Sequence, residues 1–466
     1  MTYDVLITNS HVILPQGILN KNIIVDDGKI IGFTNDTPSC DTKINGQGLV
    51  SIPGPIDTHV HYGVYSPIDK AATTESHAAA IGGITTMMRM LRLGDSYKKS
   101  LDSQLLASSN SHYIDYAIHA SIFTKQQADE MQFCVEKGIT SFKLYMNLGS
   151  DVGYVYMDME PGKSILKEVK VEVNEEIVRN VVENAAKLGC PVLVHAEDYE
   201  SCSCGIKTAK EKKKDGLSAW SQSRSPDSEV KAIQTVSKIA RDYNCTLYFA
   251  HIGSAIALEQ IKQERQNGTK IFVETCPHYL TLSYEKQEGY LAKVMPPIRT
   301  LADISSVWQA VKANQVDTIG TDHVANQLGL KLGGDDVWDA LAGFPGIGTS
   351  LPILLSEGVN KDRITLFQLI RLTSMNAAKI FGMYPKKGTL EKGSDADITL
   401  IDLKKEKKVT TDLFGGYSDY VVYDGWNLKG WPVKTIVRGK LVSDDFEVVG
   451  KLGYGKLTER ISSFKT

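Results

Sequence analysis

The first fifty residues alternate short apolar runs with polar turn residues, a pattern typical of a small β unit. Asn, Asp and Gly separate these runs. A second block of the same kind begins near residue 387. The predicted strands cover residues 3–8, 12–14, 22–25 and 29–33 in the first block, and residues 397–402, 433–438 and 440–442 in the second. Two β blocks therefore flank the middle of the chain.

The middle of the chain alternates longer apolar runs with helical stretches. Strand followed by helix, repeated about eight times, is typical of an α/β fold of the TIM-like (β/α)8 barrel type. A doubly wound open sheet shares this pattern, so periodicity alone leaves both architectures open. The predicted strands cover residues 49–51, 84–90, 115–121, 139–146, 191–196, 246–251, 271–275 and 317–321, and the clearest helices cover residues 174–188, 227–242 and 254–266.

Composition narrows the classes of partner and compartment. With 52 basic and 55 acidic residues, the 466-residue chain has a formal charge of −3, so neither nucleic acid nor an anionic membrane is an expected partner. No apolar stretch reaches the roughly 20 residues that span a bilayer, and the N-terminus lacks the pattern of a signal peptide. We therefore expect a cytoplasmic protein. Its seven scattered cysteines fit reduced thiols better than a disulfide framework.

Polar residues that could carry chemistry stand where the apolar runs end. In a parallel barrel the active site lies at the carboxyl ends of the strands. His59 and His61 are two residues apart, so on an extended chain both imidazoles point the same way and can share one metal ion. Lys143 lies inside the apolar run 139–146. There it must reach solvent, pair with an acid or change its chemistry, because burying a bare ammonium ion is costly.

Three further residues follow the same rule. His195 and His251 each close an apolar run in successive strand–helix units, and Asp322 ends the last run. One such histidine is more often a hydrogen-bonded core residue, but two in succession favour metal ligation. Four imidazoles, one lysine and one carboxylate can hold two metal ions about 3.5–4 Å apart if one group bridges them. A neutral lysine that reacts with carbon dioxide becomes a carbamate able to bridge, and burial favours that reaction.

These residues and their surroundings resemble the cyclic amidohydrolases of the amidohydrolase superfamily, specifically the hydantoinase, dihydropyrimidinase and allantoinase group. The resemblance covers nearly the whole chain. It is carried by the six residues above and by the motifs Pro53-Gly54-Pro55-Ile56-Asp57, Gly82-Gly83-Ile84-Thr85-Thr86, Ser141-Phe142-Lys143, Val194-His195-Ala196-Glu197, Glu274-Thr275-Cys276-Pro277-His278-Tyr279-Leu280 and Met295-Pro296-Pro297-Ile298-Arg299. It implies metal ligation by His59, His61, carboxylated Lys143, His195, His251 and Asp322.

The resemblance also implies a domain organisation and an assembly. Residues 1–52 and 386–445 would form an accessory β-sandwich from the N- and C-terminal segments, and residues 53–385 the metal-dependent barrel. Residues 446–466 would form a tail that takes part in oligomer contacts, because related hydantoinase tails lie against a neighbouring subunit. We therefore expect a homo-oligomer, specifically a homotetramer.

The implied reaction is hydrolysis of a carbon–nitrogen bond in a cyclic amide. Two divalent metal ions would activate a shared water, and Asp322 would take its proton and pass it to the leaving nitrogen. Zinc is the default for ligation by histidines, although manganese or cobalt suit the same ligands. No organic cofactor is expected. A non-catalytic dihydropyrimidinase-like scaffold is disfavoured because all six ligands are present, and a mononuclear deaminase is disfavoured because it needs no strand lysine.

The expected substrate is a hydantoin or dihydropyrimidine ring, because the C-terminal sequence resembles those of hydantoinases and dihydropyrimidinases. Leu148 stands where those enzymes usually place a carbonyl-polarising tyrosine, so Tyr145 is a candidate substitute. Met295 stands before the Pro-Pro pair, where a serine is usual, and the backbone of Met295 could take over the role of that serine. Residues 336–343 resemble allantoinases, which leaves an allantoinase as the alternative. A dihydroorotase is less expected, because Gly63 stands where those enzymes commonly carry a carboxylate-binding arginine.

Overall fold

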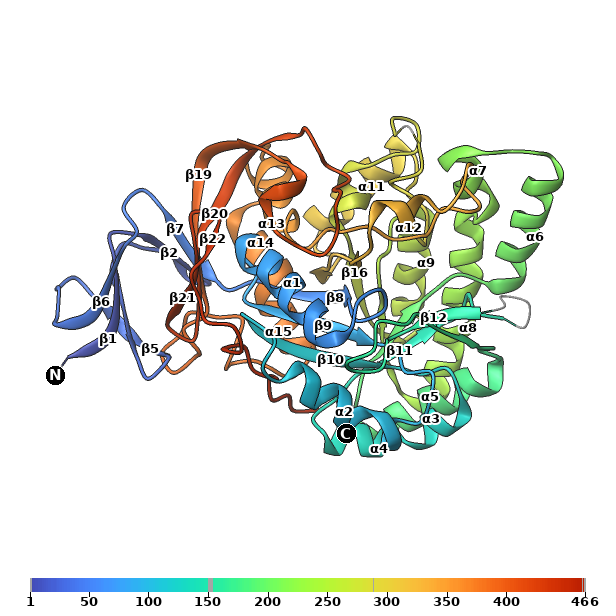
Figure 1. The fold of residues 1–466 in the computed structure, drawn as a ribbon, viewed down its shortest axis with the longest axis horizontal. Helices are drawn as coiled ribbons and strands as arrows, with labels where there is room; N and C mark the ends of the chain where they lie inside the picture. Colours follow the sequence, from blue (N-terminus) through green and yellow to red (C-terminus); the bar gives the residue numbers. More distant parts are fainter. Residues whose placement is uncertain (1, 150–153, 288, 463, 465–466) are drawn as a thin grey trace.

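The computed structural model describes residues 2–149, 154–287, 289–462 and 464. Strands of the N-terminal region form one end of the molecule, and a larger body of mixed helices and strands forms the other (Figure 1). A four-stranded sheet in the order β5-β4-β1-β6 lies at the N-terminal end. Its strands are β1 (Tyr3–Thr8), β4 (Asn22–Asp26), β5 (Lys29–Thr34) and β6 (Cys40–Asn45).

A seven-stranded sheet in the order β22-β21-β20-β19-β7-β2-β3 joins the two ends of the chain. Its centre is the antiparallel pairing of β7 with β19. Apolar side chains of this sheet and of the four-stranded sheet form one shared core, which includes Val5, Ile23, Ile398 and Ile436. The strands are β2 (His11–Leu14), β3 (Gly17–Leu19), β7 (Val50–Pro53), β19 (Ile398–Lys408), β20 (Asn427–Val437), β21 (Lys440–Asp444) and β22 (Glu447–Val448).

The larger body is built on a nine-stranded parallel sheet in the order β17-β16-β15-β14-β11-β10-β9-β8-β18. The two outermost strands, β17 and β18, are separated by only residues 320–322, so the sheet curls until its two ends meet. The strands are β8 (Ile56–His61), β9 (Thr86–Leu91), β10 (Asp115–Ser121), β11 (Phe142–Tyr145), β14 (Val192–His195), β15 (Thr246–Phe249), β16 (Lys270–Thr275), β17 (Thr318–Ile319) and β18 (His323–Val324).

One predicted strand of this sheet was wrong. Residues 49–51 were expected to be the first barrel strand, but the strand here is β7 (Val50–Pro53), which pairs with β19 and β2 of the seven-stranded sheet. The first central strand is β8, which follows after Gly54 and Pro55. At Gly54 a Cβ atom would lie 2.1 Å from Thr85 Oγ1, so the chain can pass here only without a side chain. This break divides one apolar run into two strands of different sheets.

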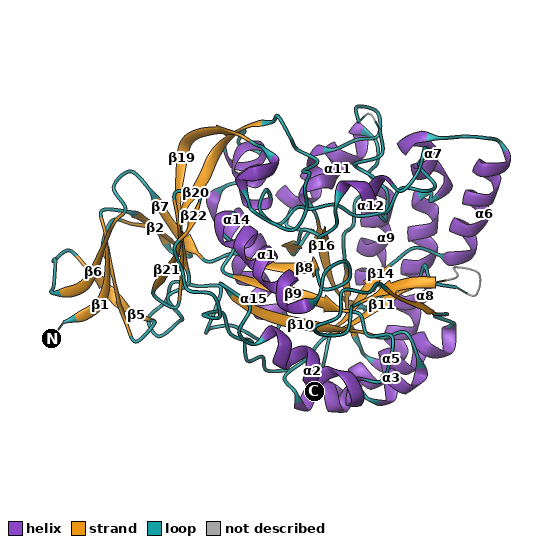
Figure 2. Ribbon diagram, viewed as in Figure 1, coloured by secondary structure: helices purple, strands orange, loops and turns teal. Residues whose placement is uncertain are grey.

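Helices cover the outside of the central sheet (Figure 2). The amphipathic helix α5 buries Val178, Val181 and Val182 in the main core. Side-chain caps set where several helices begin: Asn174 accepts a hydrogen bond from the Ile177 backbone N–H at the start of α5. The longer helices are α1 (Ile68–Ile81), α2 (Tyr97–Ser108), α5 (Glu175–Leu188), α6 (Tyr199–Glu211), α7 (Gly216–Ser223), α8 (Pro226–Tyr243), α9 (Ala255–Gln266) and α11 (Leu301–Lys312).

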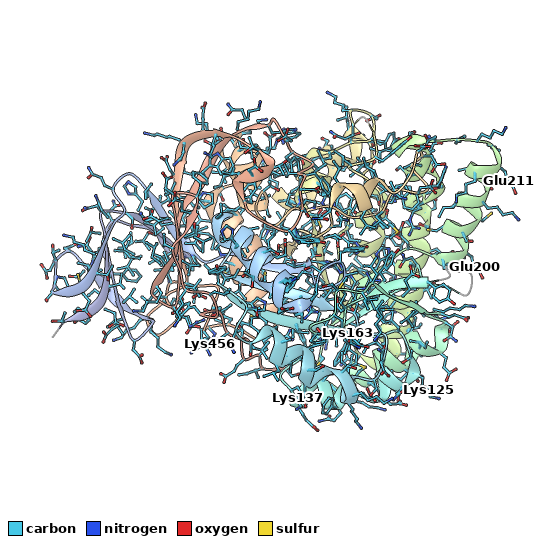
Figure 3. All side chains as sticks on the ribbon, viewed as in Figure 1. Lys125, Lys137, Lys163, Glu200, Glu211 and Lys456 are labelled. Carbon is cyan, nitrogen blue, oxygen red and sulfur yellow. The ribbon has the colours of Figure 1, made fainter. Side chains whose placement is uncertain are left out.

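Short elements fill the connections between the longer ones. The hairpin of β12 (Tyr154–Met157) and β13 (Lys167–Lys170) follows β11. The other short helices are α3 (Lys125–Asp129), α4 (Met131–Glu136), α10 (Pro277–Thr281), α12 (Leu328–Leu332), α13 (Ser350–Ile353), α14 (Leu366–Ile370) and α15 (Asn376–Ile380), with single turns of other helix types at Leu354–Val359, Arg371–Met375 and Thr411–Leu413. Charged side chains such as Lys125, Lys137 and Glu211 point outward from the outer helices (Figure 3).

The C-terminal tail packs against its own chain. Backbone N–H groups of Gly453 and Gly455 donate to His112 O, and Arg460 is buried, donating to Ser141 Oγ and Ile118 O. His112 and Ser141 lie just before the amino ends of β10 and β11, opposite the ends that carry the candidate ligands, and Ile118 lies in the middle of β10. The predicted role of the tail in an oligomer stays a prediction.

Two broader expectations concern membranes and thiols. Within the part of the chain that the structure describes, no helix combines the length and apolar character needed to cross a membrane. All seven cysteines are free thiols, as expected from their scatter.

Candidate metal centre

All six residues expected to bind metal line one cavity of about 630 Å3 at the carboxyl ends of the central strands. Parallel strands bring these ends to the same edge of a curled sheet, although the residues span more than half of the chain. His59 and His61 lie in β8, Lys143 in β11, His195 at the end of β14, His251 two residues after β15, and Asp322 between β17 and β18.

The six side chains are in close contact with one another. The His59 ring centre lies 5.2 Å from those of both His61 and His251, and the His195 and His251 centres lie 4.7 Å apart. Lys143 Nζ lies 3.5 Å from His251 Nε2. His59, His61 and Asp322 each offer a ligand atom within 4.8 Å of the others, so these three could hold one ion.

The hydrogen bonds of His59 leave its second ring nitrogen free for a cation. Glu274 Oε2 accepts from Thr58 Oγ1 at 2.5 Å and from Tyr248 Oη at 2.6 Å, and these bonds oppose the burial that raises the Glu274 pKa to about 7. Its Oε1 lies 2.7 Å from His59 Nδ1, which places the ring N–H on Nδ1. His59 Nε2 then carries a lone pair. It lies 3.3 Å from Asp322 Oδ1 and has no hydrogen-bond partner. Two electron-pair donors that face each other in a buried site fit a metal ion between them.

Burial keeps the histidines neutral, as metal ligation requires. Desolvation lowers the pKa of His61 and His195, and it lowers the pKa of His59 and His251 well below its usual range. Imidazoles in this state keep a lone pair at neutral pH. The donor set therefore suits a divalent metal ion.

Lys143 has the properties of a reactive amine. Its side chain is completely buried. Burial lowers its pKa from 10.5 to about 8, although Asp322 and Glu274 oppose the shift. A substantial neutral fraction near physiological pH makes the amine a nucleophile, which is the state that carbamate formation needs.

Two of the six residues sit on strained backbone. His251 has φ 45° and Asp322 has φ 49°, in the left-handed region that non-glycine residues seldom adopt. Such conformations cost on the order of 1–3 kcal/mol each and cluster at functional sites. At both positions the turn follows directly after a central strand and sets the direction of the ligand side chain.

Several supporting residues were not assigned a role from the sequence. Glu274 and Glu197 occur in motifs that were recognised, but their function depends on contacts that only the fold creates. Glu197 Oε2 lies 2.7 Å from His195 Nε2, and Arg224 donates two hydrogen bonds to the same carboxylate. A glutamate two residues after a strand-end histidine is the signal that could have indicated this pair.

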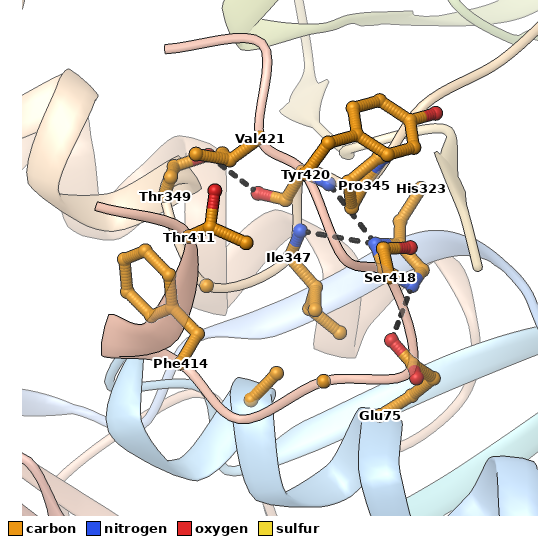
Figure 4. A pocket seen from close by; sticks show the side chains of 14 residues that line it. Glu75, His323, Pro345, Ile347, Thr349, Thr411, Phe414, Ser418, Tyr420 and Val421 are labelled. Carbon is orange, nitrogen blue, oxygen red and sulfur yellow. Dashed lines mark hydrogen bonds and ion pairs between the residues drawn. The ribbon is translucent and has the colours of Figure 1, made fainter. Parts of the chain in front are cut away.

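His323 steadies the strand that follows Asp322. Its Nδ1 accepts from the backbone N–H groups of Gly346 at 3.0 Å and Ile347 at 3.3 Å, and its Nε2 lies 2.7 Å from Glu75 Oε2 (Figure 4). These side chains line a separate cavity of about 30 Å3, which is too small for a ring substrate. The contacts hold β18, and with it the adjoining Asp322.

The residues expected to contact substrate also line the large cavity. Tyr145 and Met295 both contribute to its wall, and the Tyr145 hydroxyl lies 3.3 Å from Ser121 Oγ. Leu148, which stands where a tyrosine is usual, lines the cavity as well. Gly63 is not among the described lining residues. A Cβ atom at Gly63 would lie 2.5 Å from Arg89 Nη2, whose charge is paired with Asp158 at 3.1 Å.

One further wall of the cavity is a loop held by buried lysines. Leu341, Ala342 and Gly343 line the cavity. Lys331 Nζ donates to Leu341 O at 2.6 Å and to Gly343 O at 2.8 Å. Lys293 Nζ donates to Val337 O at 2.6 Å, at the start of the same loop. These bonds fix backbone that has no sheet partner of its own.

Comparisons with known proteins agree with this geometry. The family model described as "Amidohydrolase family" matches residues 50–442. The chain is 30% identical to an L-hydantoinase of Paenarthrobacter aurescens, over 98% of each chain, and 31% identical to a D-hydantoinase of Geobacillus stearothermophilus, over 98% of this chain and 96% of the relative.

Solved structures give the same result. A D-hydantoinase crystal structure aligns with a TM-score of 0.89 at 29% identity, covering 100% of both chains. The dihydropyrimidinase of Brevibacillus agri NCHU1002 aligns with a TM-score of 0.88 at 28% identity, covering 99% of each chain.

Proposed function

Because this chain belongs to the amidohydrolase family, we propose that it is a metal-dependent hydrolase that opens the ring of a cyclic amide, of the hydantoin or dihydropyrimidine type. The observation that carries the proposal is the convergence of four neutral histidines, a buried lysine and an aspartate on one cavity. A non-catalytic scaffold has no need of such a set.

The proposed architecture is a (β/α)8 barrel of residues 53–385 with an accessory β-sandwich of residues 1–52 and 386–445. The meeting of β17 and β18 supports closure of the barrel, with residues 318–324 serving as its last strand. The core shared by the four-stranded and seven-stranded sheets supports the sandwich. We also propose a homotetramer in which the tail 446–466 contributes to the contacts.

The proposed metal ligands are His59, His61, Lys143, His195, His251 and Asp322, with Lys143 carboxylated and zinc as the metal. The side chains fit two divalent ions, since unpaired acceptor atoms such as His59 Nε2 face one another in the buried site. When bound, such ions supply Lewis acidity toward a water molecule and the substrate carbonyl.

The chain's own residues supply the proton transfer and the positioning. Asp322 is the catalytic group: its carboxylate accepts a proton from the attacking water and returns it to the leaving ring nitrogen, so no net proton is consumed in this exchange. Glu274 and Glu197 orient His59 and His195 by accepting their ring N–H groups. Tyr145 and the backbone at Met295 are proposed to contact the substrate ring.

The test is an activity screen of the metal-reconstituted protein against hydantoin, dihydrouracil, allantoin and dihydroorotate. We expect ring opening of at least one of the first two, dependent on added divalent metal and abolished by a chelator. Turnover of allantoin alone would indicate the allantoinase alternative. Absence of all ring opening by protein that carries two metal ions per chain would contradict the proposed function.

A further inference from the structure

Arg92 stands at the carboxyl end of a central strand, at the same edge of the sheet as the candidate metal ligands. It follows β9 directly, and its side chain lines the large cavity. The guanidinium carbon lies 5.6 Å from the centre of the Tyr145 ring, and Lys143 Nζ lies 5.5 Å from the same centre. One aromatic ring therefore adjoins both the cation and the proposed bridging lysine.

Within the described chain, the Arg92 guanidinium contacts the Tyr145 ring but forms no salt bridge with a carboxylate. Its Nε is buried and makes no hydrogen bond, and no ion pair to a described carboxylate satisfies the guanidinium. Asp158 lies close by, and the Arg92 charge acts on it. Its Oδ2 accepts from Arg89 Nη2 at 3.1 Å and from the backbone N–H of Arg92 at 2.8 Å, while its buried Oδ1 accepts no hydrogen bond from the Arg92 side chain. Partial burial of an arginine that has no carboxylate partner costs free energy, unless a ligand supplies acceptors for its hydrogen bonds.

The cavity as a whole favours a negative ligand group. Of the described residues that line it, Asp322 is the only acid, and its carboxylate is committed to the metal centre. The lining cations include Arg92, Arg224 and Lys210. Arg224 forms an ion pair with Glu197, whereas Arg92 forms none with a described carboxylate. The cation–π contact with Tyr145 holds the guanidinium in place without consuming its donors.

We propose that Arg92 recognises a carboxylate on the substrate, so that the preferred substrate is a cyclic amide or ureide that carries an acidic substituent rather than a neutral or aromatic one. The planar fork of the guanidinium matches a carboxylate through two parallel hydrogen bonds. The inference rests on the proposed ring-opening function and adds its substrate class. Arg92 acts on substrate choice and takes no part in the proton transfer assigned to Asp322.

The test compares two ligands of nearly equal shape, hydantoin-5-acetate and its uncharged amide, with the metal-loaded full-length protein. Hydrolysis gives kcat/KM, and calorimetry gives the affinity whether or not the ring opens. We expect the acid to exceed the amide about 10- to 100-fold, as a charge-assisted contact provides. Arg92→Met should abolish this preference and change amide turnover by less than about threefold. Arg92→Lys should keep part of it.

A matched control is Arg179→Gln, which removes an exposed arginine on α5 that pairs with Glu175. It should leave the preference unchanged. Equal affinity of the wild-type protein for acid and amide, or an Arg92→Met variant that loses both substrates equally, would overturn the inference. Selective, Arg92-dependent binding of the acid without ring opening of any substrate would uphold the carboxylate site and contradict the proposed hydrolysis instead.

Discussion

At the scale of single residues, burial explains why the candidate ligands could be found from the sequence. A histidine, lysine or aspartate at the end of an apolar run must be satisfied by something other than water. All six lie in the cavity as expected. Arg92 has a different kind of significance. Its sequence context is unremarkable, and its proposed role rests on its place in the cavity wall and on a buried Nε without a hydrogen-bond partner, which only the three-dimensional arrangement reveals.

Replacing the proposed proton-transfer group should separate chemistry from metal binding. Asp322→Asn keeps a ligand oxygen but removes the base, so we expect a drop in kcat of about 10²–10⁴-fold with most of the metal retained. Steady-state kinetics and elemental analysis measure the two effects. Asp102→Asn, at an exposed acid paired with Lys137, is the control and should match the wild type. An unchanged kcat in Asp322→Asn would remove it from this role.

The titration of Lys143 predicts a pH dependence of reconstitution. Its pKa is lowered to about 8, so the neutral amine is the main form above that pH and declines tenfold per pH unit below it. At constant dissolved carbon dioxide, metal-free protein should therefore regain activity about tenfold more slowly for each unit below pH 8. The ligand histidines add little here, because burial already lowers their pKa values. A rate independent of pH between about 6 and 8 would contradict carbamate formation at this lysine.

At the scale of elements, the candidate ligands lie at the carboxyl ends of the central strands, and residues on other strands hold these ligands in their orientation. Most central strands and the helices α5, α8 and α9 lie within a few residues of their predicted limits, because their apolar spacing and caps are strong local signals. The first barrel strand was misplaced because residues 49–61 form almost one apolar run, and only the packing of Gly54 against Thr85 shows where the sheet changes. The hairpin β12–β13 was missed, since Lys167–Lys170 is charged and partly exposed.

The strand β16 contributes through Glu274, which predicts a specific defect. Glu274 accepts hydrogen bonds from His59 Nδ1 and from the backbone N–H of His251, so it orients two ligands at once. Glu274→Gln places an amide among these donors, and we expect metal affinity to fall about 10–100-fold. A chelator competition titration measures this. Glu264→Gln, at a buried carboxylate on α9 that pairs with Arg241 and is not among the residues lining the cavity, should not change the affinity. Equal affinities in both variants would contradict the orienting role.

At the scale of the whole molecule, the tail connects stability with assembly. The tail was expected to take part in oligomer contacts, and residues such as Arg460 are buried in their own chain near the amino end of β11. This contact could not be foreseen, because the closely spaced glycines of the tail favour neither helix nor strand. The proposed tetramer is supported by the resemblance of this tail to hydantoinase tails.

Two variants distinguish the roles of the tail. Arg460→Met leaves Ser141 Oγ and Ile118 O without this donor, so we expect a Tm lower by a few degrees with an unchanged tetramer mass. Truncation after Asp445 should lower the Tm and also reduce the number of subunits in the oligomer. Calorimetry and light scattering measure them, with Lys451→Met, at an exposed side chain, as the control. A truncated protein that still forms the same oligomer with an unchanged Tm would show that the tail contributes neither to assembly nor to stability.

The most direct test of the account is the metal content of the wild-type protein and of Lys143→Ala, measured by elemental analysis after reconstitution with zinc and bicarbonate. The buried amine beside four ligand histidines is the feature on which a two-metal centre depends. We predict two ions per wild-type chain, and loss of metal and activity in Lys143→Ala, partly restored by short carboxylic acids in solution. Two ions per chain in the untreated variant would contradict the central claim that Lys143 bridges the metals.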